Sequence, residues 1–85
     1  MKLEDKTNNN VILQAIDGAA VTANDDTILQ TGLLYIGTGG TVKVRTTQGT
    51  DLTFVGVQDG SILPVMIDKV YSTGTVDAGD MIILW

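Results

Sequence analysis

The sequence contains no cysteine, no histidine and a single proline, and only four of its 85 residues are aromatic. Without cysteine, disulfides and thiolate metal sites are excluded. Without histidine, the chain also lacks the commonest metal ligand and the usual general base of catalysis. We therefore expect that the protein is not an enzyme and that it holds no cofactor and no metal.

Basic residues are few as well, because five Lys and Arg stand against ten Asp and Glu, which gives a net charge of −5. An acidic surface repels phosphate groups, so binding to nucleic acid is not expected. No apolar run approaches the roughly 20 residues of a membrane-spanning helix. The polar start of the chain also lacks the apolar segment of a signal peptide. We expect neither a nucleic acid nor a membrane as partner.

The length predicts one small domain. A domain of this size buries only about 60% of the surface that its unfolded chain exposes, so many such domains add disulfides, a metal or partner subunits. Disulfides are excluded here and no metal is expected, and 44% of the residues are hydrophobic. The sequence therefore predicts a homo-oligomer.

Short apolar runs separated by glycine turns predict β-structure. Leu33–Ile36 is apolar, Thr41–Arg45 alternates between polar and apolar residues, and Gly37–Gly40 lies between them, which predicts a tight hairpin. Within Thr41–Arg45, Val42 and Val44 share one face of the strand, and Lys43 and Arg45 share the other. A second, two-residue hairpin is expected at Asp59-Gly60, since Asp-Gly between apolar runs favours a type I′ turn.

Other segments extend this pattern. In Asp51–Val57, Leu52 and Phe54 are expected on one face and Val55 and Val57 on the other, which predicts a strand covered on both sides. Val11–Ile16 is either a strand or one helical turn. Further strands are expected at Ala19–Thr22, Ser61–Leu63, Val65–Tyr71 and Met81–Trp85. The chain is predicted to be all-β, a small antiparallel β-sandwich or jelly-roll-like barrel of roughly six to eight short strands.

The chain is predicted to divide into a flexible region and a folded region. Residues 1–15 form a flexible N-terminal arm, and residues 16–85 form a single β domain. Met1–Asn10 has no periodic apolar residues, so it is either free or ordered on a neighbouring subunit. The acidic turns at Asp25-Asp26 and Asp77–Asp80 lack the regular ligand spacing of a calcium loop, and we interpret them as solvated turns.

The chain ends on five apolar residues, Met81–Trp85, without alternation. Such a strand is expected to be covered on both faces. Because the core of a small domain covers only one of them, the other face is predicted to meet an adjacent subunit, together with Trp85. The suspected interface residues are Met66, Ile82, Leu84 and Trp85. The alternative is that Trp85 closes the end of its own core.

From Thr22 to Trp85 the chain resembles the small spike base and head decoration proteins of tailed bacteriophages and gene transfer agents. The motifs that carry the resemblance, in chain order, are Thr22–Thr27, Leu33–Gly37, Gly40–Val44, Leu52–Val57, Gly60–Val65, Val70, Ser72–Thr75 and Ile83–Trp85. Two positions depart from the pattern: Ala23 stands where Pro is expected, and Gly32 and Leu33 stand where an Arg is expected.

The resemblance implies a structural protein on the exterior of the capsid in the virion, which either decorates the head or forms the base of a head spike or fibre. Its implied partners are the major capsid protein, a spike or fibre protein, and further copies of itself, with a pentamer favoured and a trimer as the alternative. A small carbohydrate-binding or adhesion module is the competing interpretation. It requires exposed aromatic platforms, of which four aromatic residues supply few.

Overall fold

A computed structural model describes residues 2–4 and 12–85, with side chains described from residue 15 onward. Within these residues the structure consists of strands and turns and contains no helix. The strands are β1 (Lys2–Glu4), β2 (Ile12–Gln14), β3 (Gly18–Val21), β4 (Leu33–Thr38), β5 (Gly40–Thr46), β6 (Asp51–Val57), β7 (Ser61–Ile62), β8 (Ile67–Val70) and β9 (Gly79–Leu84). The predicted all-β fold class is confirmed, and Val11–Ile16, for which the sequence allowed a strand or a helical turn, contains a strand.

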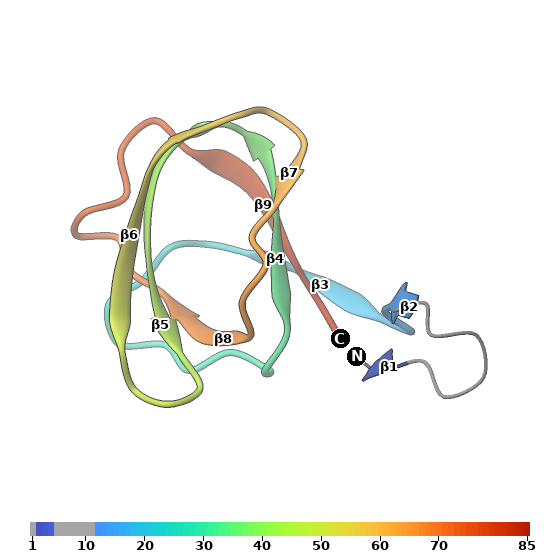
Figure 1. Ribbon diagram of the computed structural model, residues 1–85. Coiled ribbons are helices and arrows are strands. Elements are labelled where there is room, and N and C mark those ends of the chain that lie inside the picture. Colours follow the sequence, from blue (N-terminus) through green and yellow to red (C-terminus); the bar gives the residue numbers. More distant parts are fainter. Residues whose placement is uncertain (1, 5–11) are drawn as a thin grey trace.

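Two antiparallel sheets lie on opposite sides of one core (Figure 1). The four-stranded sheet has the order β3-β9-β4-β7, and the three-stranded sheet has the order β6-β5-β8. β1 pairs with β2. The arrangement is an antiparallel sandwich, as the sequence predicted.

The core lies between the two sheets and is aliphatic. β5 shows why the sequence builds it, because Val42 and Val44 are fully buried while Lys43 and Arg45 between and beside them are only half-buried. This alternation is the period of a strand with one face on the core. The buried core residues are Val21, Leu34, Ile36, Val42, Val44, Leu63, Ile67, Val70, Met81 and Ile83.

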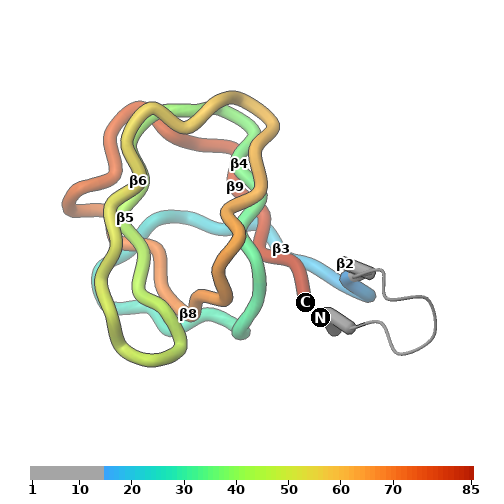
Figure 2. The backbone as a smooth tube through the Cα atoms, viewed as in Figure 1, coloured from blue at the N-terminus to red at the C-terminus, as the bar shows by residue number. Residues whose placement is uncertain are grey.

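The hairpin predicted at Gly37–Gly40 is wrong, and so is the one at Asp59-Gly60. β4 and β5 belong to different sheets, and so do β6 and β7. Both connections cross from one sheet to the other at the same end of the domain (Figure 2). The observed hairpin turn is instead at residues 47–50, between β5 and β6.

β4 and β5 on one side, and β6 and β7 on the other, form one long hairpin that bends through a corner. Ile36 of β4 pairs with Ser61 of β7. Gly40, four residues later, pairs with Val57, four residues earlier, so the register continues from one sheet to the next. At the corner the Asp59 carboxylate accepts the N–H of Gly39 at 2.6 Å. A Cβ at Gly39 would collide with the backbone carbonyl of Val57. Glycine is therefore needed for the close approach of two backbones and not for a tight turn.

A β-bulge in β6 changes which side chains face the core. The register shifts between the pairs Gly40–Val57 and Val42–Phe54, and Gly56 lies in this stretch with a φ of 71°. Phe54 and Val57 consequently both pack against the core, although they are three residues apart. Val55 points outward and is 79% exposed. The prediction that Val55 and Val57 share a face is wrong because the bulge reverses the alternation. Within a single chain the face that carries Val55 is uncovered.

β9 buries one of its two apolar faces within this chain, as expected for a strand whose other face is predicted to meet an adjacent subunit. Met81 and Ile83 are buried, whereas Ile82 between them is 39% exposed. β9 is a central strand of its sheet, so one face meets the core and the other faces outward. In this chain the outward face is uncovered at Ile82.

The remaining segments agree more closely with expectation. Pro64 separates β7 from β8, Ile67 is buried in the core and Val65 packs against it. The loop that precedes β4 runs along β8, with Leu29 N–H donating to the carbonyl of Asp68 at 2.7 Å. Residue 1 and residues 5–11 lie outside the described part of the chain, so the arm at residues 1–15 stays a prediction.

Candidate interaction surfaces

An apolar row crosses the outer face of the four-stranded sheet. Strand register places its four members side by side: Ala20 opposite Ile82, Ile82 opposite Tyr35, and Tyr35 opposite Ile62. Ala20 is exposed and Tyr35 half-buried, whereas Ile82 and Ile62 are 39% and 43% exposed. We call Ala20, Ile82, Tyr35 and Ile62 the isoleucine row. It presents contiguous apolar surface to solvent, which marks a contact site more often than scattered apolar residues do.

The four suspected interface residues do not gather at one place. Ile82 and Leu84 share the outer face of β9, because the strand alternates. Trp85 packs against the core instead, on the side of Met81 and Ile83. Its backbone continues the pairing with the start of β3, with Trp85 N–H donating to the Asp17 carbonyl at 3.0 Å.

Met66, the fourth suspected residue, is half-buried in the loop before β8, and its carbonyl accepts the N–H of Thr47 at 3.2 Å. It therefore lies beside the three-stranded sheet, at the β5–β6 turn, and not beside Ile82 and Leu84. The subunit interface itself stays a prediction. Sequence reasoning found Ile82 but missed Tyr35, Ile62 and Ala20, since only the strand order reveals that they are neighbours.

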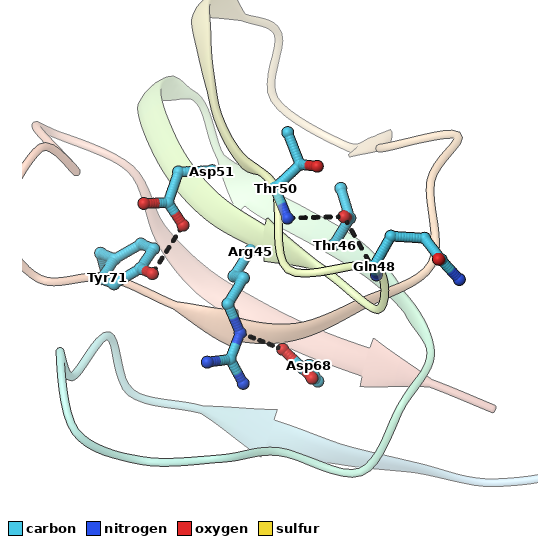
Figure 3. Close-up of polar contacts among 7 residues, drawn as sticks. All are labelled: Arg45, Thr46, Gln48, Thr50, Asp51, Asp68 and Tyr71. Atoms are coloured by element: carbon cyan, nitrogen blue, oxygen red, sulfur yellow. Dashed lines mark hydrogen bonds and ion pairs between the residues drawn. The ribbon is translucent and has the colours of Figure 1, made fainter.

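The outer face of the three-stranded sheet is polar and carries Tyr71 at its centre. The ammonium groups of Lys43 and Lys69 lie 5.0 and 5.4 Å from the centroid of the Tyr71 ring. A cation at this distance from a ring is attracted by its quadrupole. The Tyr71 hydroxyl donates to Asp51 at 2.7 Å (Figure 3). This hydrogen bond, followed by desolvation, raises the pKa of Tyr71 above its ordinary value.

One ion pair lies beside this cluster. The Arg45 Nε donates to Asp68 at 2.9 Å (Figure 3), and the hydrogen bond raises the pKa of Arg45 further. The neighbouring Thr46 hydroxyl accepts the N–H groups of Gln48 and Thr50 and so fixes the β5–β6 turn. Arg45 thus has a carboxylate partner, whereas Lys43 and Lys69 have none among the ion pairs of residues 15–85.

Two exposed valines extend this face toward the corner. Val76 pairs directly with Thr41 on one side, and the bulge places Val55 opposite Thr41 on the other. Val55 is 79% and Val76 57% exposed. We call Val55, Val76, Lys43, Lys69 and Tyr71 the basic face. The sequence pattern indicated that Lys43 points outward, but not that Lys69, Tyr71 and the valines join it.

The acidic turns act as structural elements. The Asn24 side-chain oxygen accepts the N–H of Asp26 at 2.8 Å, and Asp25 accepts hydrogen bonds from the turn at Ser72 and Thr73. Asp77 and Asp80 both adopt positive φ, 66° and 51°, which Asp tolerates better than most residues. Among the residues that the structure describes, no group of three or more His, Cys, Asp or Glu is placed to hold a metal ion.

The aromatic residues offer little surface for stacking a sugar. Phe54 and Trp85 pack against the core, and the Tyr71 ring is flanked by two lysines. Only Tyr35, in the isoleucine row, lies on an outer face without such neighbours among the described contacts.

Residues 2–4 and 12–85 include no helix that is both long and apolar enough to cross a membrane.

Comparison with known proteins identifies a structural relative. No protein-family model matches the chain, and a search of curated proteins finds no significant match. Among solved structures, the chain is similar to a chain of the structure described as the capsid of a native GTA particle, computed with C5 symmetry. The two are 31% identical with a TM-score of 0.72, over 85% of this chain and 84% of the other.

This level of identity over most of both chains, together with the shared fold, exceeds what a common β-sandwich architecture alone produces. The protein therefore belongs to the same family as this chain of the gene transfer agent capsid structure.

Proposed function

We propose that the protein is a structural component on the outer surface of a phage-like capsid, where it decorates the head or forms the base of a head spike or fibre. The observation that carries the proposal is the similarity to the chain of a gene transfer agent capsid over 85% of this sequence. The resemblance of residues 22–85 to spike base and decoration proteins supports the more specific role.

The structure suits a protein that acts by binding and not by catalysis. Its core is filled by aliphatic side chains, and its two outer faces carry exposed apolar residues, Ile62 and Ile82 on one and Val55 and Val76 on the other. Faces of this kind bury apolar area when they meet a partner, which is the main favourable term in protein association. We infer that the major capsid protein is one partner and that a spike or fibre protein is another.

Self-association is part of the proposal. A homo-oligomer is expected from the small core, and the resemblance to spike base proteins favours a pentamer over the alternative trimer. A ring at a fivefold position would place the same contacts around the axis five times over.

The test is binding to particles. Purified protein is mixed with capsids that lack it, and the particles are sedimented and imaged by cryo-electron microscopy. We expect co-sedimentation and added density on the outside of the capsid at fivefold positions. Density at threefold positions would support the trimer. Protein that stays in the supernatant at saturating concentration, or density inside the shell, would contradict the proposal. The Ile28→Asp variant, altered in an exposed loop, serves as a control for nonspecific effects of a surface charge.

A further inference from the structure

We propose that copies of this chain associate head to tail, with the isoleucine row of one copy packed against the basic face of the next. The inference rests on the homo-oligomer of the proposed function and names the two surfaces that make it. Neither surface was recognisable as a unit in the sequence, because each is assembled from strands distant along the chain.

The isoleucine row is the apolar half of the contact. Four neighbouring strands each contribute one of its residues, so the row runs across the full width of the sheet. On the same face Leu84 lies two residues from Ile82 and is half-buried, which widens the apolar surface. This face has no basic side chain, because the basic residues within residues 15–85 are Lys43, Arg45 and Lys69, on β5 and β8.

Carboxylates lie at one end of the row. Asp80 precedes Ile82 by two residues on the outer face of β9, and its Oδ2 accepts the Thr38 hydroxyl at 2.6 Å. Asp59 lies in the corner next to Gly60. A Cβ added at Gly60 would lie 3.9 Å from the Tyr35 hydroxyl, so the corner is close to the row. The partner of this row is therefore expected to offer apolar side chains with positive charge beside them.

The basic face offers both kinds of group. Val55 and Val76 supply exposed apolar groups beside Thr41. Lys43, two residues along β5, and Lys69 lie over the Tyr71 ring, while the carboxylates on this face, Asp51 and Asp68, are engaged by Tyr71 and Arg45. Both lysines lack a carboxylate partner among the described ion pairs, unlike Arg45. Their methylene stems can cover apolar surface while their ammonium groups reach carboxylates at the edge of the contact.

Charge decides between the two ways in which identical copies can meet. If the row packed on itself about a twofold axis, the interface would hold Asp80 and Asp59 of both copies and no basic side chain to balance their charge. Packing of the row against the basic face instead brings opposite charges together. Because the two sheets lie on opposite sides of the core (Figure 1), each copy can use both surfaces at once. Such a heterologous contact closes into a ring when the rotation between copies divides a full turn.

The test uses two variants, each with one surface disabled. Ile82→Asp alters the row, and the double variant Lys43→Glu/Lys69→Glu alters the basic face. Molar mass is measured by light scattering during size-exclusion chromatography at micromolar concentration. The wild type is expected to be an oligomer, and each variant alone a monomer with the 9.0 kDa mass of one chain. An equimolar mixture of the two is expected to give a dimer, because each retains the surface that the other lacks.

Several results would overturn the proposal. A wild-type monomer would do so, as would either variant assembling like the wild type, or a mixture that stays monomeric while each variant alone is folded. Circular dichroism and thermal melting establish folding. Ile62→Asp, on the short edge strand β7, replaces Ile82→Asp if the latter unfolds, and Ile28→Asp outside both faces should assemble normally. Particle binding is measured separately, so a protein that binds capsids as a monomer would refute this inference and leave the proposed function standing.

Discussion

The carboxylate of Asp25 accepts two hydrogen bonds from Thr73, one from its N–H at 3.0 Å and one from its hydroxyl at 2.6 Å. A third, from the Ser72 hydroxyl, is 3.3 Å long. These bonds join the loop after β3 to the turn after β8, 48 residues further along the chain. The hydroxyl of Thr73 is the main reason that the pKa of Asp25 lies below its ordinary value.

The lowered pKa of Asp25 makes stability depend on pH in a defined direction. A carboxyl that is more acidic in the folded state stabilises the fold above its unfolded pKa, about 4, and loses that contribution as the pH falls through the folded value. Asp25→Asn should therefore lower the melting temperature by a few degrees at pH 7, and its difference from the wild type should shrink below about pH 4.

Asp26→Asn is the matched control for this experiment, because Asp26 uses its backbone N–H and not its carboxylate in the turn. Differential scanning calorimetry from pH 2 to pH 7 compares the three proteins. Equal melting temperatures for wild type and Asp25→Asn at pH 7 would show that the Asp25–Thr73 contact does not contribute to stability.

The bulge in β6 predicts a specific cost at Gly56. Its φ of 71° is a conformation that L-residues adopt at about 1–2 kcal/mol, so Gly56→Ala should lower the free energy of unfolding by that amount. Gly79→Ala is the control, since Gly79 has no positive φ and a Cβ added there would meet no atom within 4 Å. Urea titration should find Gly79→Ala within about 0.5 kcal/mol of the wild type. Similar losses at both positions would argue against the bulge.

The bulge also marks the limit of what the sequence could predict. Strand positions followed from apolar runs and turn residues, so the all-β fold and the alternation of Val42 and Val44 were predictable. Which strands pair with one another was not predictable from the sequence. Asp59-Gly60 is a strong hairpin signal locally, but a two-residue turn there would separate β7 from β4, and the corner hydrogen bond from Gly39 to Asp59 stabilises the other arrangement. Tertiary contacts therefore outweighed local turn preference.

The interaction surfaces were predictable only in part, for the same reason. Ile82 was identifiable because β9 carries an apolar run without alternation, yet Trp85 was assigned to the outer face although strand parity places it with Met81 and Ile83. Tyr35 and Ile62 carried no signal, since they join Ile82 only through the strand order of the sheet. Periodicity identifies which face of one strand is apolar, but a surface made of four strands requires the topology.

Tyr71 is expected to titrate at high pH. Its hydrogen bond to Asp51 raises the pKa of the phenol, so the stabilisation is fully present below about pH 10 and is lost as the pH rises through the folded-state value. In the Tyr35→Phe background, absorbance at the phenolate band reports Tyr71 alone. Asp51→Asn should lower the midpoint of that titration. An unchanged midpoint would show that the Tyr71–Asp51 hydrogen bond is not formed in solution.

The N-terminal arm provides a prediction about attachment. Residues 1–10 contain few apolar side chains, so deleting them should leave the β domain folded, with the wild-type circular dichroism spectrum and a similar melting temperature. If the arm docks on the capsid or a neighbouring subunit, the truncated protein should co-sediment with capsids more weakly than the full chain. Equal binding by both would exclude a role of the arm in attachment.

Trp85 is expected to stabilise the subunit and not only the oligomer. Its side chain is half-buried against the core, and its backbone extends the β3–β9 pairing. Removing a large aromatic from a buried site costs about 3–5 kcal/mol, so at this half-buried position we expect Trp85→Ala to cost about 2–3 kcal/mol. Because the loss lies within one chain, it should be independent of protein concentration in urea titrations. Leu84→Ala, on the opposite face of the strand, is the control: it should weaken the oligomer at low concentration and change subunit stability less. If Trp85→Ala instead yields folded monomers of unchanged stability, Trp85 belongs to the interface after all.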